Sequence, residues 1–182
     1  MVYLAALAAG MRVDRDEPGL LPDDPRRRPG DLFFPTFPGG VPAALDFAVT
    51  SPLKMEGQGG AATTTLHAAM QYEEHKLADR DTAARCRRLG LQLKPMVVET
   101  LGGWGPEAQK VLWVVAKAQA AASGQLMSLA LNHLYQGLAV KLQRANAGAM
   151  LARASAVSSQ SATALATLSR AEAALVGAEA EG

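Results

Sequence analysis

The stretch from Arg26 to Pro52 constrains the fold most, because it contains two apolar segments that each carry one carboxylate. Asp31 opens segment 31–34 (DLFF), and Asp46 lies inside segment 43–50 (AALDFAVT). Their connection is rich in proline and glycine, which predicts two short strands joined by a hairpin connection. Burying an unpaired carboxylate costs several kcal/mol, so an aspartate inside such a strand needs a reason. Two of them on neighbouring strands suggest a metal site; the alternative is that one or both point to water from an exposed edge hairpin.

The alternation of side chains along the second segment separates its aspartate from an apolar set. Asp46 shares a face with Ala44, Ala48 and Thr50, whereas the opposite face carries Leu45, Phe47 and Val49. We expect the opposite face to lie against the core, and the Asp46 face to meet a cleft, solvent or a helix terminus. For Asp31, which follows Pro29-Gly30, an alternative is that its side chain only caps a turn.

The remaining pattern predicts an α/β fold, with a small mixed central sheet flanked by helices and a C-terminal helical extension. In chain order we expect helix 2–9, a weak strand within 11–16, the two carboxylate strands, helix 61–89, strand 91–100 with its centre at 96–98 buried, and helices 106–122 and 125–153. We divide the chain into an α/β domain (1–122), a packed C-terminal helix (123–153) and an Ala/Ser-rich tail that is helical or disordered (154–182).

Composition narrows the classes of function. The net charge of +1 gives no overall field that would attract nucleic acid or a membrane, so such affinity would come from local clusters. No apolar run approaches the ~20 residues of a membrane-spanning helix, and a single cysteine excludes an internal disulfide. The helix that begins abruptly at Met1 suggests the tail end of a longer protein.

A family resemblance enters at this point. The runs RRRPGDLFF and PAALDFAVTSPL, a later helix with a lysine, and PMVVETLGGWGPEA resemble the restriction-endonuclease-like domain of the PD-(D/E)XK superfamily. The likeness is to the version found at the C-terminal end of retrotransposon reverse-transcriptase polyproteins. It covers residues 1–153 and implies a DNA endonuclease that hydrolyses phosphodiester bonds with Mg²⁺, in an intracellular setting that is nuclear if the source is eukaryotic.

Carried over residue by residue, the resemblance makes Asp31 and Asp46 the two metal ligands. The family's lysine, two residues after the second carboxylate, falls here on Ala48, which has no amine. Some members supply this lysine from the following helix, and Lys76 is then the candidate; Lys54 is nearer in sequence but lies beyond the strand end. The alternative for Lys76 is an ordinary surface pair within its charged helix.

Basic residues gather in two places that could flank the carboxylates: Arg26, Arg27 and Arg28, and Arg85, Arg87 and Arg88. We expect them to form a track for DNA phosphates; the alternative is an ordinary solvated face. The rival to a nuclease is a catalytically inactive remnant that binds nucleic acid or protein. In either case the long C-terminal helices could mediate association into a homo-oligomer.

Overall fold

The computed structural model describes residues 1–54 and 58–179, with side chains described for 1–54 and 59–154. It is an α/β fold around a four-stranded mixed sheet in the order β1-β2-β3-β4. The strands are β1 (Asp14–Arg15), β2 (Leu32–Phe34), β3 (Ala43–Thr50) and β4 (Gln92–Glu99). β2 pairs antiparallel with β1 and β3, and β3 pairs parallel with β4. The predicted fold class is confirmed, and β3 has the bounds that the sequence predicts.

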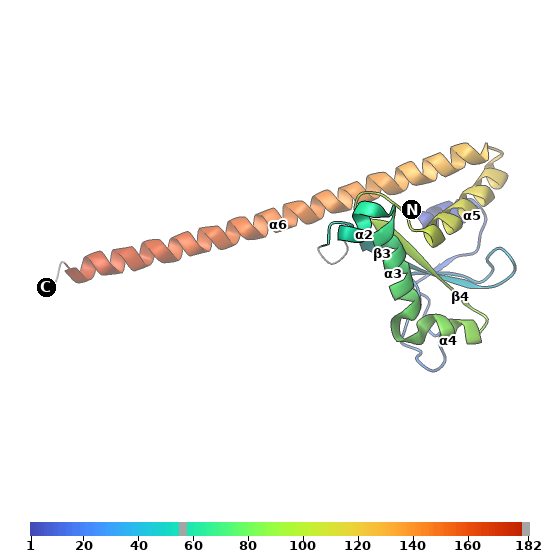
Figure 1. Cartoon of the computed structure of the whole chain (residues 1–182), viewed down its shortest axis with the longest axis horizontal. Coiled ribbons are helices and arrows are strands. Elements are labelled where there is room, and N and C mark those ends of the chain that lie inside the picture. The colour runs from blue at the N-terminus through green and yellow to red at the C-terminus, as the bar shows by residue number, and fades with distance from the viewer. Residues whose placement is uncertain (55–57, 180–182) are drawn as a thin grey trace. The chain divides into compact units, whose positions relative to one another are not determined.

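A parallel pair needs a long crossover between its strands, and here that crossover is helical. It consists of α2 (Gln58–Thr63), α3 (His67–Ala78), the short 3₁₀ helix η2 (Asp79–Asp81) and α4 (Thr82–Arg88). α3 and α4 pack against β4 on one face of the sheet (Figure 1). The opposite face is covered by α1 (Val2–Ala8) and α5 (Pro106–Ser123), together with the first turns of α6 (Met127–Glu179).

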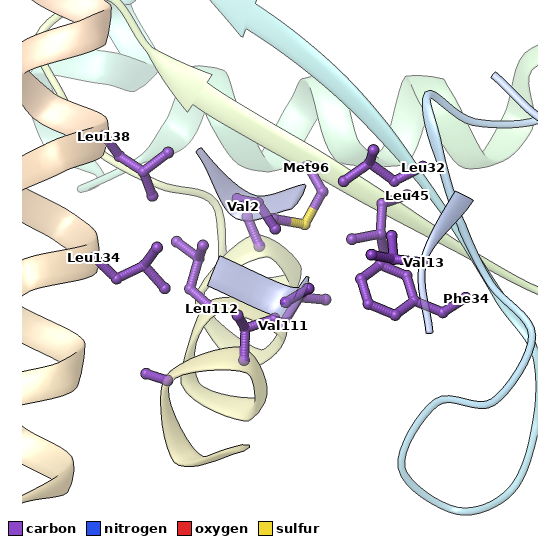
Figure 2. Close-up of a cluster of buried hydrophobic side chains, with 14 of the residues drawn as sticks. Val2, Val13, Leu32, Phe34, Leu45, Met96, Val111, Leu112, Leu134 and Leu138 are labelled. Carbon is purple, nitrogen blue, oxygen red and sulfur yellow. The ribbon is translucent and has the colours of Figure 1, made fainter. Parts of the chain in front are cut away.

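The main core lies on the α1/α5 face, where large apolar side chains from every layer meet (Figure 2). Phe34, Leu45 and Met96 point from the sheet into it and are fully buried. Val111 and Leu112 approach from α5, and Leu134 and Leu138 from α6. Such side chains each contribute roughly 1.5–3 kcal/mol on burial, so this face supplies most of the hydrophobic stabilisation.

The α3/α4 face has a much smaller apolar cluster, made of Leu21, Ala44, Cys86 and Leu91. The predicted separation of Asp46 from the apolar side of β3 is therefore correct, because Leu45 faces the main core and Ala44 faces the crossover helices. The expectation for Val49 is wrong: its side chain is 55% exposed. β3 continues past the residues that pair with β2, so the side chains near its end are less buried.

The single predicted helix 61–89 is also wrong, since the chain is broken twice within it. Leu66 has φ of 60°, and Arg80 and Asp81 have φ of 47° and 57°, all in the left-handed region that interrupts a helix. At the second break the Thr82 hydroxyl donates to the Asp79 carbonyl oxygen (2.8 Å), a local bond that competes with helical hydrogen bonding. Each break turns the chain, and together they bring α3 across β3 and β4.

The predicted break at 123–124 is confirmed, with Gly124 in the left-handed conformation at φ of 68°. The chain forms two compact units, Met1–Leu142 and Gln143–Gly182. The second unit, which contains the predicted tail, is helical as far as Glu179, and residues 180–182 lie outside the described part. Within the described residues no helix combines the length and the apolar character that crossing a membrane requires.

Candidate functional site

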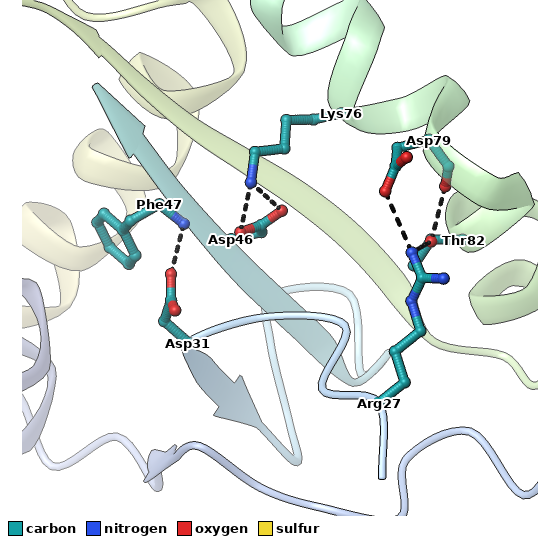
Figure 3. A network of polar contacts seen from close by, with 7 residues as sticks. All are labelled: Arg27, Asp31, Asp46, Phe47, Lys76, Asp79 and Thr82. Atoms are coloured by element: carbon teal, nitrogen blue, oxygen red, sulfur yellow. Dashed lines mark hydrogen bonds and ion pairs between the residues drawn. The ribbon is translucent and has the colours of Figure 1, made fainter. Parts of the chain in front are cut away.

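Asp46 and Lys76 form a two-pronged ion pair between β3 and α3 (Figure 3). The Lys76 ammonium donates to both carboxylate oxygens, at 2.9 Å to Oδ1 and 2.8 Å to Oδ2. The two side chains are 22% and 23% exposed, so the pair is partly shielded from water. The residues are thirty positions apart in the chain. The strand has no amine at Ala48, and the crossover helix α3 instead brings the amine of Lys76 to the Asp46 carboxylate.

The orientation of α3 explains how Lys76 reaches this position. The helix directs Ala69, Glu73 and Lys76 toward the protein, while Met70 and Leu77 are 40% and 41% exposed. Polar side chains thus occupy much of the inward face that an amphipathic helix normally fills with apolar ones. Ala48 shares the strand face of Asp46 and contributes only a methyl group, so a long side chain from α3 has room above the strand.

Asp31 lies at the open edge of β3, just before β2. Its Oδ2 accepts the backbone N–H of Phe47 at 2.7 Å, and its own N–H donates to the Leu45 carbonyl oxygen at 2.8 Å. The preceding Gly30 is required by this close approach, because a Cβ there would come within 2.7 Å of the same carbonyl oxygen. Asp31 is thus fixed to the neighbouring strand rather than capping the Pro29-Gly30 turn.

The electrostatics of the site are dominated by Asp46. Burial raises the pKa of its carboxyl above the ordinary value, and the hydrogen bonds and charge of Lys76 oppose that rise without cancelling it. The charges of Asp31 and Asp79 raise the pKa further, because each disfavours a second negative charge nearby. Asp31 therefore lies close enough to Asp46 for their charges to interact. A carboxylate kept in an environment that disfavours its charge is a common mark of a functional site.

Asp31 and Asp46 are the two carboxylates of the site that could hold a metal ion. Among the described residues Asp31 accepts a hydrogen bond only at Oδ2, which leaves its Oδ1 available, whereas both oxygens of Asp46 accept from Lys76. No group of three or more His, Cys, Asp or Glu side chains that could hold a metal occurs in the described part of the chain. A donor set of two carboxylates is small, but Mg²⁺ is commonly held by one or two carboxylates plus waters and phosphate oxygens.

The predicted basic track is largely occupied by ion pairs. Arg27 donates to Thr82 Oγ1 (2.5 Å) and Asp79 Oδ2 (3.2 Å), which ties its loop to the start of α4 (Figure 3). Arg85 binds Asp23 at 2.9 Å, and the exposed Arg28 and Arg88 pair more loosely with Asp16 and Asp81 at 3.5 and 3.6 Å. Arg26 and Arg87 are exposed and have no ion-pair partner in the described residues. These two carry the least compensated positive charge of the six.

Two buried glutamates near the site hold helix ends, a role that the sequence does not reveal. Glu73 is 8% exposed and accepts the N–H groups of Glu107 (3.1 Å) and Ala108 (3.4 Å) at the start of α5. Glu99, also 8% exposed, accepts the N–H of Ala69 (3.2 Å) in the first turn of α3. A carboxylate at a helix N-terminus satisfies free N–H groups and favourably meets the helix dipole. Glu99 thereby helps to fix the helix that carries Lys76.

Comparison of the chain with protein-family models, with curated proteins and with solved structures gave no match. The resemblance to the PD-(D/E)XK superfamily therefore rests on the quoted sequence runs alone and stays a prediction.

Proposed function

We propose that this chain is a metal-dependent endonuclease domain of the retroelement kind, which hydrolyses phosphodiester bonds of DNA with Mg²⁺. The single observation that carries the proposal is the bidentate contact of Lys76 with Asp46. The strand sequence lacks a lysine at Ala48, and without an amine from elsewhere the site would be incomplete for this chemistry. Lys76 reaches Asp46 from α3, and the proposal assigns it the role of the missing amine.

Each residue has a distinct role in this proposal. Asp31 and Asp46 hold the cation, and when bound it neutralises phosphodiester charge and lowers the pKa of attacking water. Lys76 orients Asp46 before substrate arrives and, with DNA bound, directs its ammonium at the attacking water or the scissile phosphate. The exposed Arg26 and Arg87 contact the DNA backbone, which makes binding salt-dependent.

Moving the lysine back to the strand tests the role of Lys76. We expect Lys76→Ala to reduce nicking of supercoiled DNA by at least about a hundredfold, in the range for loss of one positioned catalytic group. The double variant Ala48→Lys/Lys76→Ala restores an amine next to Asp46 and should recover at least a tenth of the wild-type rate. Lys110→Ala, which removes an exposed lysine from α5, is the matched control and should nick normally.

Undiminished nicking by Lys76→Ala would contradict the assignment of Lys76. Nicking undiminished in Asp46→Ala would contradict the site as a whole. If no DNA is nicked by folded wild-type protein under any divalent cation, the rival of an inactive remnant is correct.

Metal binding can be measured without any activity. A cation that binds only the folded state raises the free energy of unfolding by RT ln(1 + [L]/Kd), about 1.4 kcal/mol at ten times Kd. We expect Mg²⁺ to raise the melting temperature of the wild type and not that of Asp46→Asn. Equal shifts in the two proteins would show that the cation does not bind at Asp46.

A further inference from the structure

A cavity of about 360 Å³ adjoins Asp31 on the α1/α5 side of the sheet. Its volume falls within the ~300–1,000 Å³ typical of small-molecule sites. The wall combines aromatic side chains from distant segments (Tyr3, Phe47 and Trp104) with two cations (Arg15 and Lys141). The chain therefore places rings, positive charge and a proposed metal ligand around one hollow.

The aromatic part of the cavity offers apolar ring surface to a ligand. Phe47 and Tyr3 are half-buried, so part of each ring is accessible from the cavity, and Trp104 is 8% exposed. Aromatic side chains of this kind stack on nucleobases without regard to base identity. The lining is largely apolar, which does not suit a sugar or a free phosphate alone.

The charged part of the cavity is suited to an anion. Arg15 and Lys141 are both exposed, and the Arg15 guanidinium carbon lies 3.9 Å from the centre of the Tyr3 ring, which holds the cation over an aromatic wall. A ligand that satisfies both parts carries a planar ring and a phosphate. A nucleotide has both.

Asp31 is the one residue of the proposed metal site that also lines the cavity. Phe47 lines the cavity and donates its N–H to Asp31, whereas Asp46, the residue before it in β3, projects from the opposite face of the sheet toward Lys76. We propose that the cavity binds one unpaired nucleobase of the DNA strand, with its phosphate between the Arg15 and Lys141 cations. The inference rests on the proposed function in taking DNA as the source of that nucleotide, and it names DNA with an unpaired nucleotide as the preferred substrate.

Trp104 can report binding directly, because the chain has two tryptophans and the other, Trp113, is 48% exposed on α5. In the Trp113→Phe background, without metal, we expect dTMP and dAMP to quench the Trp104 fluorescence saturably and deoxyribose 5-phosphate to leave it unchanged. Phe47→Leu, which keeps an apolar side chain but removes the ring, should weaken nucleotide binding at least about fivefold. Arg15→Ala should weaken it by a similar factor and needs no buried side chain to be replaced. The matched control is Arg12→Ala, which removes an exposed cation that does not line the cavity.

The same variants define the preference for DNA structure. We expect a duplex with a single unpaired nucleotide to bind about tenfold more tightly than the fully paired duplex, and the preference to disappear in Phe47→Leu. Saturable quenching in a protein that nicks no DNA would support the cavity assignment and overturn only the proposed function. Normal nicking without nucleotide quenching, or with an unchanged preference in Phe47→Leu and Arg15→Ala, would overturn the inference and leave the proposed function standing. Binding of an uncharged apolar dye without any binding of nucleotides would also overturn it.

Discussion

The two faces of the central sheet are built on different principles. The α1/α5 face is filled with large apolar side chains such as Phe34, Met96 and Leu112, all fully buried. The α3/α4 face has a small apolar cluster, and charged side chains make specific contacts beside it. Lys76 holds Asp46, Glu73 holds the start of α5, and Arg27 holds the start of α4.

The difference shows that the two faces contribute unequally to stability. Charged groups at partly buried positions contribute little net stability, because desolvation offsets most of their attraction. A protein tolerates them where function requires them and stabilises itself elsewhere. Here the apolar face provides the stability, and the polar face provides an aspartate whose pKa is raised by burial next to an amine.

The largest expected effect comes from comparing adjacent phenylalanines of β2 that point to opposite faces. Phe34→Ala should lower the free energy of unfolding by about 3–5 kcal/mol, because Phe34 is fully buried in the main core. Phe33→Ala, at a half-buried position on the other face, should cost roughly 1 kcal/mol. Urea unfolding followed by circular dichroism measures both. Equal losses would mean that the two faces share the stabilisation.

A smaller effect is expected at the capping glutamate of the polar face. Glu73→Ala removes the acceptor for two N–H groups at the start of α5 and should cost about 0.5–2 kcal/mol. Its neighbour Glu74 is exposed, and Glu74→Ala should stay within about 0.5 kcal/mol of the wild type. Thermal unfolding of both variants at neutral pH tests the difference. A Glu73→Ala protein as stable as Glu74→Ala would show that the cap contributes nothing.

The smallest expected effect is on the pH dependence of stability, which should have opposite signs for Glu73 and Glu107, two glutamates that meet at the start of α5. Burial raises the pKa of Glu73 above 4.5. The part of the stability that comes from this shift is fully present below pH 4.5 and is lost as the pH rises through the folded pKa, while the hydrogen bonds to the start of α5 contribute separately. Burial also acts on Glu107, but hydrogen bonds from Lys94 and Lys110 outweigh it and lower the pKa. Its contribution is present above pH 4.5 and is lost as the pH falls through the folded pKa.

As the pH rises, the free energies of unfolding of Glu73→Gln and Glu107→Gln should therefore change in opposite directions relative to the wild type. Between pH 3 and 7 the Glu73→Gln protein gains relative stability, whereas the Glu107→Gln protein loses it, each by about 1 kcal/mol or less. Differential scanning calorimetry across this range measures both trends. Parallel trends would contradict the opposite assignments of the two carboxyls.

How well the sequence predicts an element depends on whether its determinants are local. β3 is predicted to the residue, because its alternation and its flanking prolines are local features. The helix at 61–89 fails because its breaks require positive φ at Leu66, Arg80 and Asp81, and none of these is a glycine that would announce such a conformation. The threonines at 63–65 and the DRDT run at 79–82 are the available signals, since both residue types compete for backbone hydrogen bonds.

The site divides in the same way. The alternation of side chains along β3 is enough to separate Asp46 from the core. The helical periodicity of α3 places Lys76 on a polar side of the helix, but it does not say which part of the protein that side contacts. The Lys76–Asp46 contact follows only from the family resemblance, and its catalytic role stays a prediction. The partners of Glu73 and Glu99 could not be predicted, because each lies about thirty residues away in the chain and on a different element.

The bond from the Phe47 N–H to Asp31 has a consequence for self-association. β2 pairs with β3 only through Leu45, so beyond that point the β3 edge has no strand partner among the described residues, and Val49 is exposed there. A bare apolar edge invites a second chain to add a strand, and proteins commonly prevent this with a charge. The carboxylate of Asp31 occupies the first free donor of that edge and repels an incoming backbone. Asp31→Ala would therefore remove protection against edge-to-edge aggregation together with a proposed metal ligand. Asp31→Asn would keep an acceptor for the Phe47 N–H at this edge.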